Sequence, residues 1–207
     1  GFGGSQTFEF SSNGNGTVSS TNLAWMPMKR AEFLLNYTWR DQDDLEAGDG
    51  TTIGNSAFET PSFLAKGKFT FGQDDAHSLS LSHSQTVADD KDVPYDQFIT
   101  TADAFGRVDR VTDTRKSVLE YRFNPVSDLI DLRANLSYAD QDVASDYIPG
   151  SSPLEGTPGF RGILGLADAD HRYETTKLTV NNRVLFDTGA VSHDMVAGFE
   201  LQRRKRA

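Results

Sequence analysis

Apolar and polar side chains alternate along much of the chain, and the segment LIDLRANLSYAD, residues Leu129–Asp140, is a clear example. Its alternate positions carry Ile130, Leu132, Ala134, Leu136 and Tyr138. Side chains of an extended strand point to opposite faces at successive residues, so these five share one face. The residues between them are mostly charged or polar. The segment is therefore predicted to be a strand with one apolar face and one polar face.

The same period of two recurs in nine segments, whereas helical periodicity is weak almost everywhere. The predicted strands are Gln6–Ser12, Thr17–Met26, Ala31–Asp41, Pro61–Gly72, His77–Val87, Asp113–Phe123, Leu129–Ala139, Arg172–Phe186 and Val191–Arg203. Most hold about ten to thirteen residues, roughly twice the usual strand length of about five or six in soluble sheets.

The connections between these segments alternate between short and long. Short turns occur at PMKR, GQDDAH, NPVSD and DTGA, and long segments lie at residues 42–60, 88–112 and 140–171. In a series of antiparallel hairpins, this alternation places the short turns at one end of the sheet and the long loops at the other. Only the first connection, SNGNG, is short at the long-loop end.

Strand length and loop asymmetry together favour a sheet whose apolar face meets lipid. A tilted strand needs about 9–11 residues to cross a membrane, and outer-membrane barrels have short periplasmic turns and long extracellular loops. No amphipathic helix is predicted that could cover the apolar face. The fold class predicted is all-β, an antiparallel transmembrane β-barrel segment of about nine strands. A soluble β-sandwich or barrel remains the alternative, and His83, Gln85 and His193 on the apolar faces weigh towards it.

Composition narrows the possible functions. Thirty Asp and Glu against 20 Lys and Arg give a net charge of −10, which is unfavourable for general binding of nucleic acid. The absence of cysteine excludes disulfides, a thiol nucleophile and a Cys-ligated zinc site. No run of about 18 apolar residues is present that would predict a transmembrane helix. Both ends of the chain look cut, because each falls within a strand pattern. We therefore expect a piece of a longer protein.

Several stretches resemble the TonB-dependent outer-membrane receptors, specifically the haem and haemoglobin receptor branch. The opening GFGGSQTFEF is similar to the junction between plug and first barrel strand, and the run from LAWMPMKR to KGKFTF resembles the second to fourth strands. GQDDAHSLSLSHSQT and YRFNPVSDLIDLRANLSYAD resemble the next two hairpins. The similarity covers most of the chain. It lies in the pattern of the strands and turns and not in an invariant motif.

The resemblance implies a 22-stranded barrel in the bacterial outer membrane that takes up haem or another iron chelate. Residues 1–207 would be the N-terminal part of that barrel, with the plug domain and the remaining strands outside this chain. The partners would be the TonB complex, which acts through the plug, and haem or a haem-carrying protein. Lipopolysaccharide and outer-membrane lipid would surround the barrel as further partners. No cofactor is expected in this chain, and haem would be the transported ligand. The motif in which such receptors carry their axial histidine has no match here, so no ligand residue is carried over.

Two local features are candidates for binding. The loop DQDDLEAGDGT brings together carboxylates that could bind calcium, although their spacing is not that of an EF-hand. These candidates are Asp41, Asp43, Asp44, Glu46 and Asp49. His171 ends the longest loop, where its imidazole could coordinate haem iron. A solvated acidic loop and a strand-entry histidine are the simpler interpretations.

Few other residues suggest a binding or catalytic role. The basic run Arg203, Arg204, Lys205 and Arg206 could meet lipopolysaccharide phosphates. No motif supports an enzyme, and none is expected. Besides the iron or haem transporter, an unplugged porin-like barrel and a soluble carbohydrate-binding β-domain stay open as alternative functions. A plug domain preceding Gly1 would separate the transporter from the porin.

Overall fold

The fold was obtained as a computed structural model, and it describes residues 1–95 and 105–206. Nine long strands carry it within that range: β1 Phe2–Ser11, β2 Gly16–Met28, β3 Ala31–Gln42, β7 Ser62–Phe71, β8 His77–Pro94, β9 Arg107–Ser127, β10 Ile130–Tyr147, β11 Ala169–Thr188 and β12 Val191–Arg206. The smaller elements are β4 Leu45–Glu46, β5 Thr52–Ile53, β6 Phe58–Glu59, α1 Phe160–Ala167 and two single 3₁₀ turns, Asn13–Asn15 and Gln73–Asp75.

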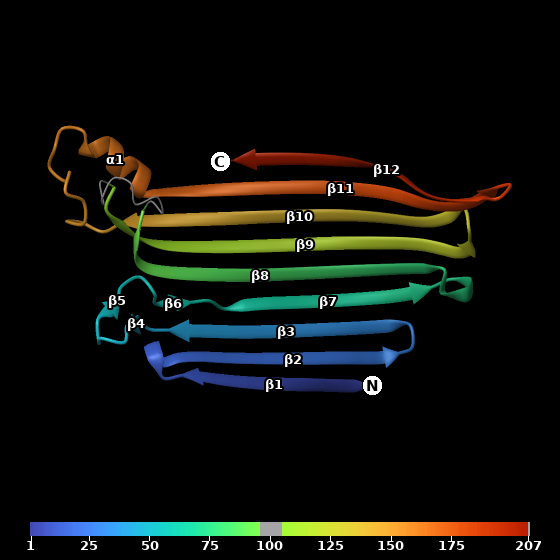
Figure 1. The fold of residues 1–207 in the computed structure, drawn as a ribbon, viewed down its shortest axis with the longest axis horizontal. Coiled ribbons are helices and arrows are strands. Elements are labelled where there is room, and N and C mark those ends of the chain that lie inside the picture. Colours follow the sequence, from blue (N-terminus) through green and yellow to red (C-terminus); the bar gives the residue numbers. More distant parts are fainter. Residues whose placement is uncertain (96–104, 207) are drawn as a thin grey trace.

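The long strands form one antiparallel sheet in which each strand pairs with its neighbours in the sequence. The order is β1-β2-β3-β7-β8-β9-β10-β11-β12, and β6 extends the line of β7 against β3 and β8. Pro61 separates β6 from β7, because proline has no backbone N–H for the ladder. Figure 1 shows the short turns at one end of the sheet and the long connections at the other, as the sequence predicts.

The strands are longer than predicted on the long-loop side. β8 runs to Pro94, β9 begins at Arg107 and β10 runs to Tyr147. These extensions take up part of the second and third long segments that the sequence pattern left as loops. Part of the second segment lies outside the described residues. The first long segment contains β4, β5 and β6, and the third contains the eight-residue helix α1, none of which the sequence pattern predicts.

The sheet is a single layer, and among the described residues no element covers either face (Figure 1). Within the same range, the only hydrophobic side chains that are buried are Ala31, Val108 and Phe160. Large apolar side chains stay exposed instead: Leu81 is 57% exposed and Leu201 is 62% exposed. A soluble domain of this size would bury a core of such residues. The sheet therefore needs an apolar environment against one face.

Strand register gathers the apolar side chains into continuous rows across the sheet. One row crosses all nine long strands through direct cross-strand partners: Phe2, Trp25, Phe33, Gly67, Leu81, Leu119, Leu136, Leu178 and Leu201. We call the face that carries this row the apolar face and the opposite face the polar face. The alternation predicted strand by strand thus becomes one surface.

In the part of the chain that the structure describes, no helix combines the length and the apolar character that a membrane crossing requires.

Candidate functional site: the polar face and the long-loop end

The polar face is lined by small polar side chains that bond across neighbouring strands. Asn36 donates from Nδ2 to Oδ1 of Asn22 at 2.8 Å, and the hydroxyls of Ser20 and Thr38 lie 2.8 Å apart. Further along the sheet, Gln141 donates to Oγ1 of Thr114 at 3.1 Å. Each pair bridges two strands, so the polar face is hydrophilic and laterally bonded.

Several charged groups on the polar face form ion pairs. Arg122 donates from Nε and Nη2 to the two carboxylate oxygens of Asp131, at 2.7 and 3.0 Å, and Arg133 reaches the same carboxylate at 3.1 Å. Arg183 forms a second two-bond pair with Asp194, at 2.7 and 2.6 Å. Such bidentate pairs fix both side chains in one geometry. These two clusters lie towards the short-turn end and stiffen that rim of the sheet.

His171 lies on the polar face near the start of β11, at the long-loop end. Its cross-strand partner is Val143 on β10, and Tyr173 follows it on the same face. The guanidinium of Arg206 lies 5.4 Å from the centre of the Tyr173 ring, a cation–π distance. The imidazole is half-buried and reaches the end of the sheet where the long connections gather. A haem-ligand role for His171 stays a prediction.

Three carboxylates of the acidic loop accept hydrogen bonds from nearby backbone and side-chain groups. One Asp44 oxygen accepts hydrogen bonds from the backbone N–H groups of Ser56 and Ala57, at 3.0 and 2.9 Å. Asp43 accepts from the side-chain amide of Asn15 at 3.0 Å. The backbone N–H of Thr51 donates to Asp49 at 3.0 Å and lowers the pKa of this carboxyl below its usual range.

These bonds tie the loop to itself and to the β1–β2 connection. The residues described contain no group of three or more His, Asp or Glu side chains arranged to hold a metal ion. The five candidate carboxylates, Asp41, Asp43, Asp44, Glu46 and Asp49, are thus not gathered into one ligand set, and calcium binding there stays a prediction.

The basic run at the end of β12 alternates between the two faces. Arg203 and Lys205 lie on the apolar face opposite Thr176 and Glu174, whereas Arg204 and Arg206 lie on the polar face. Lys205 pairs with Glu174 at 3.5 Å. The expected row of four adjacent cations is thus divided, two to each face.

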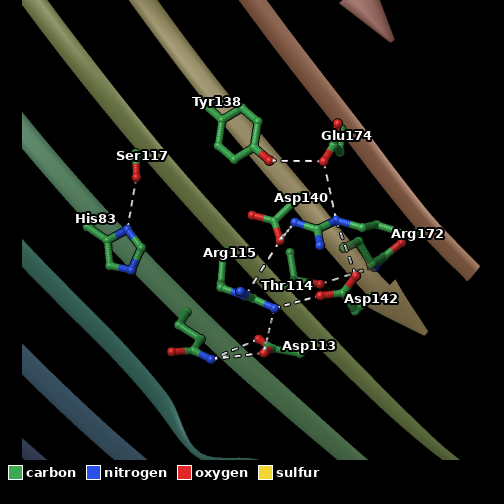
Figure 2. A network of polar contacts seen from close by, with 12 residues as sticks. His83, Asp113, Thr114, Arg115, Ser117, Tyr138, Asp140, Asp142, Arg172 and Glu174 are labelled. Carbon is green, nitrogen blue, oxygen red and sulfur yellow. Dashed lines mark hydrogen bonds and ion pairs between the residues drawn. The ribbon is translucent and has the colours of Figure 1, made fainter. Parts of the chain in front are cut away.

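A polar network that sequence reasoning missed lies on the apolar face at the long-loop end (Figure 2). Arg115 donates to Asp142 at 2.6 Å, lies 3.2 Å from Asp113 and lies 3.6 Å from Asp140. Arg172 lies 3.6 Å from Asp140 on the other side. The side chain of Asp140 is only 6% exposed, so its charge is enclosed between the two guanidinium groups.

The network continues to either side along the same rows. Gln85 donates to both oxygens of Asp113, at 2.9 and 3.0 Å, and Glu174 lies 3.3 Å from Arg172. The sequence signal is present in β10, where the apolar-face positions change from Leu136 and Tyr138 to Asp140. We infer that this change marks where the apolar band of the sheet ends.

Comparison with solved structures finds the same fold within parts of larger proteins. The FrpB iron transporter from Neisseria meningitidis matches 99% of this chain with a TM-score of 0.75 and 22% identity, and a second variant of FrpB matches with a TM-score of 0.72 and 20% identity. The Serratia marcescens hemophore receptor HasR, solved in complex with its hemophore HasA and heme, matches 99% of the chain with a TM-score of 0.74 and 19% identity. No family model and no curated protein matches the chain.

These matches confirm the predicted fold class. The chain covers 31%, 27% and 30% of the three matched proteins, so it spans less than one third of each. An iron transporter and a hemophore receptor match almost equally well, so the fold does not resolve the haem branch of the predicted family. At this low identity the likeness is one of fold, and the fold is an all-β antiparallel sheet that matches part of a TonB-dependent receptor barrel.

Proposed function

We propose that this sheet is the N-terminal part of the barrel wall of a TonB-dependent outer-membrane transporter that takes up haem or another iron chelate. One observation carries the proposal: a row of apolar residues, with Gly67 on β7 as its smallest member, crosses nine strands on a face that nothing in the described chain covers, and the opposite face is polar. A lipid bilayer outside and a hydrated or plugged lumen inside satisfy both faces at once.

The open edges of β1 and β12 fit the same proposal. Each edge presents unpaired backbone N–H and C=O groups, which cannot remain unsatisfied in hydrocarbon. Further strands would close the sheet into a barrel, and a plug domain would fill its lumen and contact the TonB complex. The transporters that match in fold are about three times longer than this chain, which leaves room for these parts.

The iron or haem cargo is proposed from the named relatives together with the polar long-loop end. Capture would occur among the long connections, where His171 faces the lumen side, and TonB-driven movement of the plug would then release the cargo inwards. Haem or a haem-carrying protein would be the external partner. The residues of this chain would shape the lumen and the vestibule.

The test uses the full-length protein in a bacterium that lacks its other iron receptors. Outer-membrane fractionation, growth on haem as the iron source, and growth on ferric chelates are measured with and without the gene. The proposal predicts outer-membrane location and growth that depends both on the gene and on TonB. Location elsewhere would overturn it. Steady open-channel conductance in planar bilayers with no TonB dependence would favour the unplugged porin instead.

A further inference from the structure

Charge is divided between the two faces of the sheet at its long-loop end. One cross-strand row on the polar face runs from Lys116 on β9 through Ala139 and Thr175 to Arg204 on β12. From this row to the long-loop ends of β9–β12, every Asp and Glu of these four strands lies on the apolar face, where several of them belong to the polar network. The polar face of the same strands carries cations instead.

Three exposed cations, Lys116, Arg204 and Arg206, form what we call the cationic patch. No carboxylate of residues 1–95 or 105–206 forms an ion pair with any of them, and Arg206 contacts only the Tyr173 ring. By contrast, Lys177, one row nearer the short turns on the same face, pairs with Glu200 at 2.9 Å. The positive charge of the patch is therefore not neutralised by the described part of the chain.

The floor of the cationic patch is small and polar. Lys116 and Arg204 are three strand spacings apart, about 14 Å between their backbones. The two residues between them, Ala139 and Thr175, are short, so the long cationic side chains can lean inwards over them. On the next row, Gln141 donates a hydrogen bond to Thr114 at 3.1 Å. The patch thus offers cations at its edges and hydrogen-bonding groups between them, over a span that one small polyanion can bridge.

Carboxylates reach the polar side of this region only beyond the patch. Asp90 on β8 lies opposite Arg110 on β9, about 20 Å along β9 from Lys116. Glu155, in the connection after β10, accepts a hydrogen bond from the hydroxyl of Tyr147 at 2.9 Å. Because Asp90 faces a cation of its own and Glu155 is engaged at the strand end, neither cancels the charge of the patch.

We propose that the cationic patch binds a polyanionic ferric chelate, in which several carboxylate or catecholate oxygens surround the iron, as the chelate enters the lumen. The inference deepens the proposed function and rests on it, because the polar face must line the lumen of a transporter. Cations of one sign on a low-dielectric wall concentrate anions, and guanidinium groups bind pairs of anionic oxygens. Haem fits less well, because its apolar ring would lie on the polar floor.

The test measures binding of ferric chelates to the full-length protein in detergent, by quenching of tryptophan fluorescence. Ferric citrate and a ferric tris-catecholate are the anionic probes, and an uncharged ferric trihydroxamate and haem are the comparison probes. Arg204→Gln removes one charge from the patch, whereas Arg203→Gln removes the same charge one residue away on the apolar face. A triple variant, with Lys116→Gln, Arg204→Gln and Arg206→Gln, removes the whole patch.

The wild-type protein and Arg203→Gln are expected to bind an anionic chelate with the same affinity. Arg204→Gln should weaken this affinity by about tenfold, as expected for the loss of one charge-assisted hydrogen bond, and the triple variant by about a hundredfold or more. Added salt should weaken binding of the anionic chelate and leave the trihydroxamate unaffected. The tighter of the two anionic probes identifies the chelate as a carboxylate or a catecholate.

Three results would overturn the proposal. They are no binding of either anionic chelate by the wild-type protein, equal affinity of the wild-type protein and the triple variant, and tighter binding of haem or the trihydroxamate than of both anionic chelates. None of them would touch the transporter proposal, which is decided separately by outer-membrane location and TonB-dependent growth. An intact, heat-modifiable barrel on a gel shows that each variant has folded.

Discussion

The loss of stability caused by a single arginine on each face of β10 identifies which face of the sheet is exposed to lipid and which faces the lumen. Ala134 lies on the apolar face, midway between the short turn and the level of the polar network, with Tyr121 and Val180 as cross-strand partners. Asn135 is the next residue and lies on the polar face opposite Glu120. The variants Ala134→Arg and Asn135→Arg therefore add the same charge within one residue of each other.

The structure sets the expected magnitudes. An arginine facing lipid near the centre of the bilayer costs about 2–4 kcal/mol in a membrane barrel. Because about 1.4 kcal/mol corresponds to a factor of ten, Ala134→Arg should weaken the folding equilibrium by roughly 30- to 700-fold. The Asn135→Arg side chain faces Glu120, and such opposite-charge cross-strand pairs contribute about 0.2–1 kcal/mol. Its free energy of unfolding should therefore stay within about 0.5–1 kcal/mol of wild type.

The assay is urea-dependent unfolding of the full-length protein in phosphatidylcholine vesicles, followed by tryptophan fluorescence. The difference between the two variants is the quantity of interest, because both carry the same added side chain. Equal costs for the two variants, or a larger cost for Asn135→Arg, would refute the assignment of the faces.

Three further predictions follow from the site geometry. Asp140→Ala removes the carboxylate enclosed between Arg115 and Arg172. It should lower the free energy of unfolding by about 1–3 kcal/mol in the same titration. A loss under about 0.5 kcal/mol would contradict a stabilising role for the network. Asp44→Ala frees the backbone N–H groups that it binds and should speed proteolysis of the loop. If EDTA speeds proteolysis of this loop in the wild-type protein, the loop also binds calcium. If EDTA leaves the proteolysis rate unchanged, the role of Asp44 is structural alone. His171→Ala should abolish the Soret shift on haem titration if this imidazole is an axial ligand, whereas an unchanged spectrum would exclude it.

The strands and their faces could be predicted from the sequence because a period of two is a local property. In β10, residues 130–138 alone define both faces. The register that aligns Leu119 with Leu136, and Leu178 with Leu201, depends on the geometry of the short turns at NPVSD and DTGA, which join these strands directly. That part of the fold is encoded within each hairpin.

The strand extensions and the polar network could not be predicted in the same way. Beyond Tyr138 the apolar face carries Asp140 and Asp142 while the polar face carries Val143, so the alternation disappears although the strand continues. The ladder there is supported by contacts between distant residues, such as Arg115 with Asp142, 27 positions apart. The helix α1 is eight residues long, which is too short for a periodicity to be recognised.

For the candidate binding residues, too, the sequence alone does not show where each side chain points. The sequence places His171 at the end of a long segment, and only the register shows that it lies on the polar face. For the loop that contains Asp44, composition suggests an ion, whereas the structure assigns this carboxylate to two backbone N–H groups. Proximity in the sequence does not determine where each carboxylate points.

The central claim is that the apolar face meets lipid, and spin-label accessibility measures this most directly. Single spin labels are placed in turn at positions 132–139 of the full-length protein in outer-membrane vesicles, and collision rates with oxygen and with a water-soluble nickel complex are recorded. The account predicts that the oxygen-to-nickel ratio alternates with a period of two, with maxima at Leu132, Ala134, Leu136 and Tyr138. Maxima at the intervening positions, or no alternation at all, would contradict it.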